Sequence, residues 1–259
     1  MTSDTLQAAL SLPQFPSRLP AVGTTIFTTM SALALQHEAV NLGQGFPDFA
    51  CDPRLTQAVA QAMTQGHNQY APMAGVAPLR EAIAAKMAAL YGRSYDPGTE
   101  ITVTAGATQA ILTAVLCCAG PGDEVMVLDP CYDSYVPAIT LAGARAVRVP
   151  LKPGDFHPDL DRIAAALTPK TRALIINSPH NPSGTVWSAA DMQALQEMLT
   201  LTNVVLISDE VYEHMVYAPL RHESVARYPG LAARAFIVSS FGKTYHVTGW
   251  KVGHVAAPA

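Results

Sequence analysis

From residue 101 onward, short apolar segments rich in β-branched residues alternate with helix-like segments of about ten to fifteen residues. Near-continuous apolar strands that alternate with helices are typical of a parallel sheet covered on both faces. We therefore predict an α/β fold of three α/β/α layers around a mostly parallel sheet of about seven strands. The expected strands span residues 101–104, 124–128, 145–149, 172–176, 204–208, 236–239 and 252–256.

Helix signals precede and separate these strands. Pro78 suits the first turn of a helix and Gly92 ends it, while Ser188 and Asp191 have the spacing of an N-terminal cap. The first forty residues are punctuated by prolines, which predicts an extended arm followed by a helix. The expected helices span residues 24–38, 53–65, 78–91, 108–118, 132–142, 159–167 and 188–201.

The chain of 259 residues carries few charges, with 16 Lys and Arg against 20 Asp and Glu and a net charge of −4. A charged fraction of 14%, where soluble domains average roughly 25%, indicates a large core and excludes a disordered chain. No basic run provides the footprint of a nucleic-acid binder. No apolar stretch approaches the roughly 20 residues of a membrane span, and no export signal is evident. We expect a cytoplasmic protein without a nucleic-acid or membrane partner.

The cysteines and histidines show no metal-binding pattern. The four cysteines form no C-x-x-C pair, and the eight histidines form no H-E-x-x-H motif. We therefore predict structural thiols in a reducing compartment and no metal site.

Polar groups suited to ligand binding follow five of the expected strands. In an open α/β sheet, ligands bind at the carboxyl ends of the strands, so these groups should converge. Together they offer an amine nucleophile, a buried carboxylate, aromatic rings, an amide and an anion site at a helix start, which is the set that pyridoxal 5'-phosphate requires. The groups are the segment 105–108, Tyr132, Asn181, Asp209 with Tyr212, and Ser240 with Lys243.

Three other motif interpretations fail on spacing. Ser240 and Lys243 fit the S-x-x-K of penicillin-binding serine hydrolases, but the chain has no K-T-G partner motif. A nucleotide-triphosphate loop ending at Lys243 would need a glycine where Ile237 stands, and a dinucleotide fingerprint from Gly43 would need one at Asp48.

Several runs in fixed order make the chain resemble the class I/II, fold type I, aminotransferases from about residue 40 to 259. Within that family the similarity is strongest to the methionine aminotransferase and kynurenine aminotransferase branch. The runs that carry the resemblance are residues 43–49, 68–70, 104–108, 181–184, 208–212, 239–244 and 249–253.

The resemblance implies a role for each matching residue. Lys243 would carry the internal aldimine and shuttle a proton. Asp209 would pair with the pyridine nitrogen, and Tyr212 and Asn181 would hydrogen-bond the ring oxygen. The remaining positions would stack on the ring (Tyr132), hold phosphate (Gly106, Ala107, Thr108, Ser240, Lys251), reach the phosphate of a neighbouring subunit in a homodimer (Tyr70), or lie against substrate (Gly45, together with Asn181).

The resemblance also implies the function and the domain limits. We expect an aminotransferase that moves an amino group from methionine-like or aromatic amino acids to a 2-oxo acid. Residues 1–40 would be an arm and helix belonging to a small domain, and residues 41–259 an incomplete pyridoxal-phosphate-binding large domain.

Family members continue for roughly another third of their length, into a domain that supplies an arginine for the substrate carboxylate. We therefore expect a C-terminally truncated chain that binds cofactor poorly or not at all and does not transaminate alone. A pyridoxal-phosphate-dependent C–S β-lyase and a non-catalytic remnant of a truncated gene are the alternatives.

Overall fold

The computed structural model describes residues 16–45 and 47–259, and the chain divides into two compact units, residues 1–45 and 46–259. In the first unit, α2 (Ile26–Gln36) begins after Thr25, whose side-chain oxygen accepts a hydrogen bond from the backbone N–H of Thr28. This helix lies inside the predicted range 24–38. Residues 1–15 of the predicted arm, and Phe46 in the run 43–49, lie outside the described residues.

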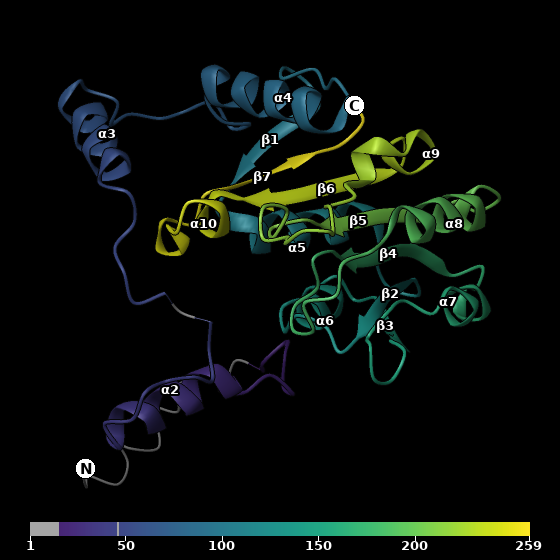
Figure 1. The fold of residues 1–259 in the computed structure, drawn as a ribbon. Coiled ribbons are helices and arrows are strands. Elements are labelled where there is room, and N and C mark those ends of the chain that lie inside the picture. The colour runs from purple at the N-terminus through teal and green to yellow at the C-terminus, as the bar shows by residue number, and fades with distance from the viewer. Residues whose placement is uncertain (1–15, 46) are drawn as a thin grey trace, which may run out of the picture. The chain divides into compact units, whose positions relative to one another are not determined.

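The second unit contains a seven-stranded sheet in the order β1-β7-β6-β5-β4-β2-β3 (Figure 1). The four pairings among β2, β3, β4, β5 and β6 are parallel, which confirms the mostly parallel sheet. The strands are β1 (Ile101–Thr104), β2 (Glu124–Asp129), β3 (Arg145–Pro150), β4 (Thr171–Asn177), β5 (Val205–Asp209), β6 (Ala235–Ser240) and β7 (Gly253–Ala256).

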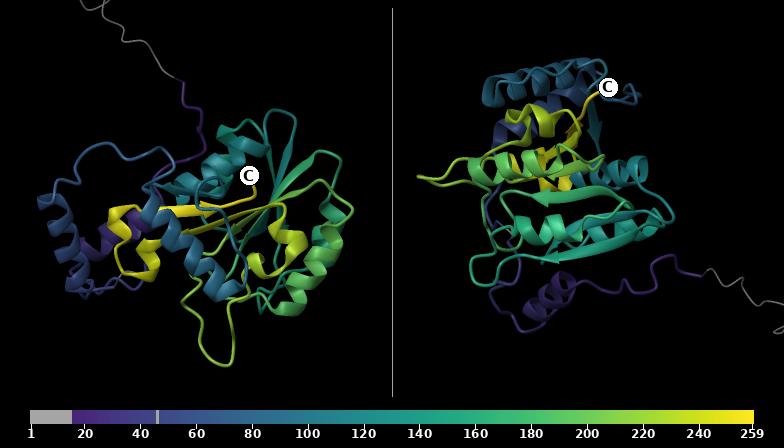
Figure 2. Two further views of the ribbon diagram at one scale, coloured as in Figure 1. Left: turned by 90° about the horizontal axis from the view of Figure 1, so that it is seen from above. Right: turned by 90° about the vertical axis from the view of Figure 1, so that its right-hand side faces the viewer.

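Helices cover both faces of this sheet. Seen from above in Figure 2, the strands run between the teal helices α5 and α6 on one side and α4, α8 and α9 on the other. The helices of the second unit are α3 (Pro53–Thr64), α4 (Ala77–Tyr91), α5 (Gly106–Cys118), α6 (Tyr135–Leu141), α7 (Leu160–Ala166), α8 (Ala189–Leu199), α9 (Pro229–Ala232) and α10 (Phe241–Thr244), with the 3-10 turns η1 (Val225–Arg227) and η2 (Thr248–Trp250).

Each face has its own apolar core. Met126, Leu174 and Leu206 point to the face covered by α4, α7, α8 and α9. Their chain neighbours Val125 and Ile175 point to the face covered by α5 and α6. Successive strand residues point to opposite faces, so apolar residues at consecutive positions are what a sheet buried on both sides needs.

The predicted caps of the two long helices are present. The Ser188 hydroxyl accepts from the backbone N–H of Asp191 at 3.1 Å, and the Asp191 carboxylate accepts from the backbone N–H of Ser188 at 2.8 Å. This reciprocal pair fixes the start of α8. At the other end of α4, Gly92 takes the left-handed conformation with φ 72°, which a residue without a Cβ adopts at little cost.

The direction of β7 differs from an all-parallel arrangement. β7 lies between β1 and β6 and is antiparallel to both. The connection from β6 to β7 consists of α10 and η2, which are single turns and do not cross a face of the sheet. A parallel neighbour would need a crossover connection, usually through a full helix. The sequence pattern of an apolar run does not encode this direction.

The starts of α5 and α6 also differ from prediction. α5 begins at Gly106, two residues before the expected start, and α6 begins at Tyr135, three residues after Tyr132. Lys243 follows β6, as its place after the expected strand 236–239 indicated, and it lies on α10. The short helical turns α9, α10, η1 and η2 were not predicted, because three or four residues give no periodicity to recognise. In the part of the chain that is described, no helix is both long and apolar enough to cross a membrane.

We predict that Leu206→Ala lowers the free energy of unfolding by about 2–5 kcal/mol, because it leaves a cavity where a fully buried side chain packs between β5 and the helices above it. Urea denaturation measures the change. Leu201→Ala is the matched control, since Leu201 is 96% exposed, and its unfolding free energy should stay within about 0.5 kcal/mol of the parent value. Equal losses in the two variants would contradict this assignment of the core.

Candidate functional site

Three strands place the residues of the predicted anion site side by side. The register pairs Ser240 of β6 with Gly253 of β7, and Gly253 in turn with Thr104 at the end of β1. Gly106 and Ala107 follow as the first residues of α5. The N–H groups of a first helical turn have no partner within the helix, so they are available to an anion.

Gly253 makes this close arrangement possible. A Cβ atom at this position would lie 2.7 Å from the carbonyl carbon of Gly106 and 2.8 Å from the backbone nitrogen of Ala107. No side chain fits there without moving the backbone. Gly253 was not among the predicted site residues, although it belongs to the run 249–253 on which the family resemblance rests.

Lys251 lies at the same corner. Its backbone has φ 55°, in the left-handed region that few residues with a side chain occupy. A Cβ atom built on Gly106 would lie 3.9 Å from Cδ of Lys251, so the lysine stem passes the start of α5. The lysine is exposed and brings a positive charge to the free N–H groups of that helix.

The residues around the start of α5, namely Gly106, Ala107, Ser240, Lys251 and Gly253, are called the anion corner below. The rings of Tyr132 and Tyr135 lie between this corner and the carboxylate of Asp209. Burial raises the pKa of the Tyr132 phenol, while the side chain of Thr108, in the first turn of α5, acts to lower it. Tyr132 meets Tyr135 edge to face with 5.8 Å between ring centroids. The Tyr135 phenol then donates a hydrogen bond of 2.6 Å to Oδ2 of Asp209.

Asp209 is a buried carboxylate at the end of β5, and it is 5% exposed. Its side chain accepts from the Tyr135 phenol and from the backbone N–H of Val211. Burial raises the pKa of Asp209 to about 6, although these two hydrogen bonds and the charge of Lys243 act in the opposite direction. The carboxylate is therefore short of positive partners, and a cationic N–H group placed beside it would lower its pKa.

Lys243 projects from α10 toward the turn that follows β5. Its Nζ lies 5.6 Å from the centroid of the Tyr212 ring. Burial, and then the positive charge of Lys251, lower the pKa of the Lys243 amine below its ordinary value, while Asp209 acts to raise it. A lowered pKa increases the fraction of neutral amine, which is the nucleophilic form.

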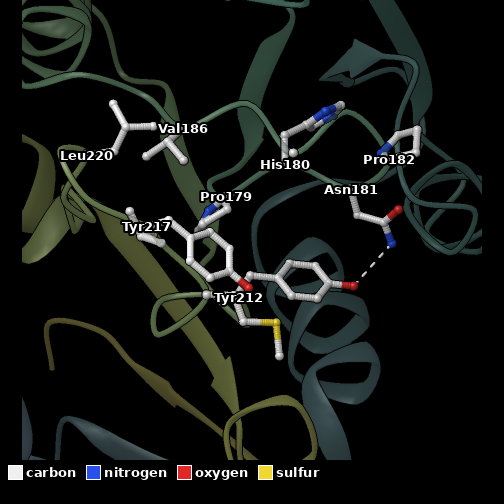
Figure 3. Close-up of a pocket in the computed structure, with 11 residues that line it drawn as sticks. Pro179, His180, Asn181, Pro182, Val186, Tyr212, Tyr217 and Leu220 are labelled. Atoms are coloured by element: carbon white, nitrogen blue, oxygen red, sulfur yellow. Dashed lines mark hydrogen bonds between the residues drawn. The ribbon is translucent and has the colours of Figure 1, made fainter. Parts of the chain in front are cut away.

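Asn181 completes the group. Its amide donates to the Tyr212 phenol at 3.3 Å, as the dashed line in Figure 3 shows. Asn177, at the end of β4, positions the loop by accepting from the backbone N–H of Asn181 at 2.7 Å and donating to the carbonyl of Asp209 at 2.9 Å. A cavity of about 370 Å³ opens beside Asn181 and Tyr212, with Met215 among the side chains that line it.

Most of the predicted site residues meet at this end of the sheet. They are Gly106, Ala107, Thr108, Tyr132, Asn181, Asp209, Tyr212, Ser240, Lys243 and Lys251. Tyr70 does not join them, because its side chain is fully exposed. Gly45 is the last residue of the first unit.

Two further residues that contact the cluster were missed. Tyr135 follows Tyr132 by three residues, and Asn177 precedes Asn181 by four residues. Both could have been found from their spacing to a residue that was named.

The comparisons with known proteins agree with this geometry. The family model for aminotransferase class I and II matches residues 37–259. The chain belongs to the class I and II aminotransferases. Methionine aminotransferase of Escherichia coli is 53% identical over 248 residues, and a probable N-succinyldiaminopimelate aminotransferase of Mycobacterium tuberculosis is 50% identical over 245 residues.

The fold agrees with solved aminotransferases. The crystal structure of YbdL from Escherichia coli, identified as a methionine aminotransferase, has a TM-score of 0.91 at 52% identity and covers 95% of this chain. The chain spans 65% of that structure. The match to the Escherichia coli methionine aminotransferase covers 96% of this chain and 64% of that relative. The match to the Mycobacterium tuberculosis relative covers 94% of this chain and 62% of that relative.

The pKa of Asp209 leads to a prediction about stability. Because the pKa in the folded chain, about 6, exceeds the ordinary value of 3.8, folding takes up a proton between these limits. The unfolding free energy should fall as pH rises from about 4 to about 6, by about 3 kcal/mol, and stay low above that range. Asp209→Asn should remove this fall, so the variant gains stability over the parent at pH 7.5 and not at pH 3.5.

Urea unfolding at several pH values measures this difference. The exposed Asp48 provides the control, since Asp48→Asn should leave the pH dependence of the parent chain in place. A parent chain and an Asp209→Asn variant with parallel stability curves would show that Asp209 titrates normally.

Proposed function

We propose that this aminotransferase chain binds pyridoxal 5'-phosphate at the cluster described above and serves in amino transfer from methionine-like or aromatic amino acids to 2-oxo acids. The observation that carries the proposal is the convergence of Lys243, Asp209 and the Tyr212–Asn181 pair next to the free N–H groups of α5. The relative named as a methionine aminotransferase supports the donor class.

The residues present fit this cofactor. When bound, it supplies an aldehyde for an amine and a pyridine ring that accepts electrons. Among the described residues no cation hydrogen-bonds Asp209, so this carboxylate would receive the protonated ring nitrogen. Gly106 to Thr108, Ser240 and Lys251 would hold the phosphate, because backbone N–H groups, a hydroxyl and an ammonium all donate hydrogen bonds.

Lys243 would bind the aldehyde and move the proton. Its lowered pKa leaves more neutral amine at Nζ than an exposed lysine has, and the neutral amine is the form that would bind an aldehyde or, when free, hold a proton. Tyr212 and Asn181 would orient the ring through its oxygen, and Tyr132 would cover one ring face.

The remaining parts of the proposal concern domains and assembly. Residues 41–259 would form most of the cofactor domain, and residues 1–40 would belong to a smaller domain. The exposed side chains of Tyr70 and Met73 support a contact with a second subunit, in which Tyr70 would reach the partner's phosphate. We also propose a cytoplasmic location, in keeping with the reducing compartment that the free cysteines suit.

We predict that excess pyridoxal 5'-phosphate gives an imine absorption band with the purified chain, and that borohydride reduction then fixes the label on Lys243. Reduction traps even a weakly bound cofactor. Peptide mapping by mass spectrometry locates the label. Lys243→Ala should abolish both band and label, whereas the exposed Lys152→Ala should keep them. A label spread over surface lysines would refute the proposed site.

Lys251 tests the phosphate end separately. We predict that Lys251→Gln raises the dissociation constant for the cofactor roughly ten- to hundredfold, because a hydrogen bond to a charged group contributes about 1.5–3 kcal/mol. Titration of the absorption band measures the constant. Pyridoxal without its phosphate should bind the parent and the variant equally. A loss of the same size with pyridoxal would place Lys251 away from the phosphate.

A further inference from the structure

A second buried carboxylate, Glu213, directly follows Tyr212 and is 5% exposed. Its Oε1 accepts hydrogen bonds of 2.6 Å from Nζ of Lys86 and of 2.6 Å from the hydroxyl of Ser239. The Tyr91 phenol donates to its other oxygen. Glu213 is thus saturated with donors from inside the chain, and the proposed function has no use for it.

The donors come from two elements that are distant in sequence. Lys86 and Tyr91 belong to α4, and Ser239 belongs to β6. Burial raises the pKa of Glu213, but the charge and hydrogen bond of Lys86, with the bonds from Ser239 and Tyr91, outweigh burial and hold the pKa at about 2. A buried ion pair with complete hydrogen bonding is costly to break from one side. Glu213 therefore holds the turn after β5, the end of β6 and α4 together.

Two other ionisable groups face this ion pair. His254 of β7 is buried, and burial followed by the charge of Lys86 lowers its pKa to about 4, against the effect of Glu213. It is neutral near pH 7 and does not compete with Lys86 for the carboxylate. His214 is more exposed, with Nε2 at 4.0 Å from Glu213.

The position of Glu213 between two site segments gives the ion pair a second role. The β5–β6 ladder is extended by one hydrogen bond, from the backbone N–H of Glu210 to the carbonyl of Val238. Beyond that point the Glu213–Ser239 hydrogen bond joins the same two segments. One segment carries the Tyr212 ring, and the other continues into α10 with Lys243.

We propose that Glu213 is a positioning residue that, through Ser239 and Lys86, holds the Tyr212 ring against the Lys243 amine. The inference rests on the proposed function for the role of Lys243. The contacts of Glu213 do not depend on that function. Glu213 acts through position, because the charges that shift the pKa of Lys243 are those of Lys251 and Asp209. Loosening the link would expose more of the half-buried Lys243 side chain to water.

The test measures the proton affinity of Lys243 in the complete 259-residue chain without cofactor. An amine-reactive acetylating reagent is applied over a range of pH, and mass spectrometry gives the labelling rate of Lys243. Ser239→Ala removes the link to β6 and leaves the Lys86–Glu213 pair intact. We expect its labelling midpoint to move to higher pH, and each pKa unit of movement lowers the rate at pH 8 by about tenfold.

Ser224→Ala is the matched control. Ser224 is also a fully buried serine whose hydroxyl takes part in one local hydrogen bond, to the backbone N–H of Ala226, and it contacts neither Glu213 nor Lys243. Its midpoint should equal that of the parent chain even where its thermal stability falls. If Ser239→Ala and Ser224→Ala both keep the parent midpoint, the ion pair is structural only and the proposal is overturned.

Two variants of the ion pair extend the test. Glu213→Gln should move the midpoint in the same direction as Ser239→Ala, while Lys86→Arg, which keeps the charge, should leave the midpoint near that of the parent. An unchanged midpoint in a folded Glu213→Gln variant would also overturn the proposal. Failure of the proposed function would look different. Pyridoxal 5'-phosphate would then give no imine band, while the variants would still show the expected shifts of the Lys243 labelling midpoint.

Discussion

Both faces of the central sheet are covered by helices, and this coverage decides where polar chemistry can occur. The strands β2, β4 and β5 carry apolar side chains on both sides, so a ligand cannot approach either face. What remains is the end of the sheet, where the strands finish and the backbone turns. Asp209 and Ser240 are the last residues of their strands, and Asn181, Tyr212 and Lys243 follow just beyond a strand end.

Two carboxylates, Asp209 and Glu213, are buried at that end of the sheet, and they differ in the partners that the chain gives them. Glu213 has a lysine and two hydroxyl donors, and its pKa is held at about 2. Asp209, four residues earlier, accepts from a phenol and a backbone N–H, the two donors that the described part of the chain offers it, and burial raises its pKa to about 6. The first carboxylate is fully satisfied by the chain, and the second is not. This difference separates a group that supports the site from one that has capacity left for a ligand.

Much of the fold could be predicted because apolar runs and helix caps are local signals. The seven strands and the cap formed by Ser188 and Asp191 were predicted close to their observed positions. The direction of β7 was not, since it depends on how a short connection turns. Lys243, Asp209 and Asn181 could be named from their places after strands. Gly253 and the partners of Glu213 could not, because their importance depends on contacts between segments far apart in the sequence.

The pairing of β1 with β7 has a consequence for the order in which the site forms. β1 ends at Thr104 and β7 begins at Gly253, so about 150 residues are synthesised between these two paired strands. Gly106 and Ala107 can pack against Gly253 only after nearly the whole unit has been translated. Loop closure over so long a segment is slow compared with local helix formation. The anion corner is therefore a late product of folding, and it would report whether the sheet has closed.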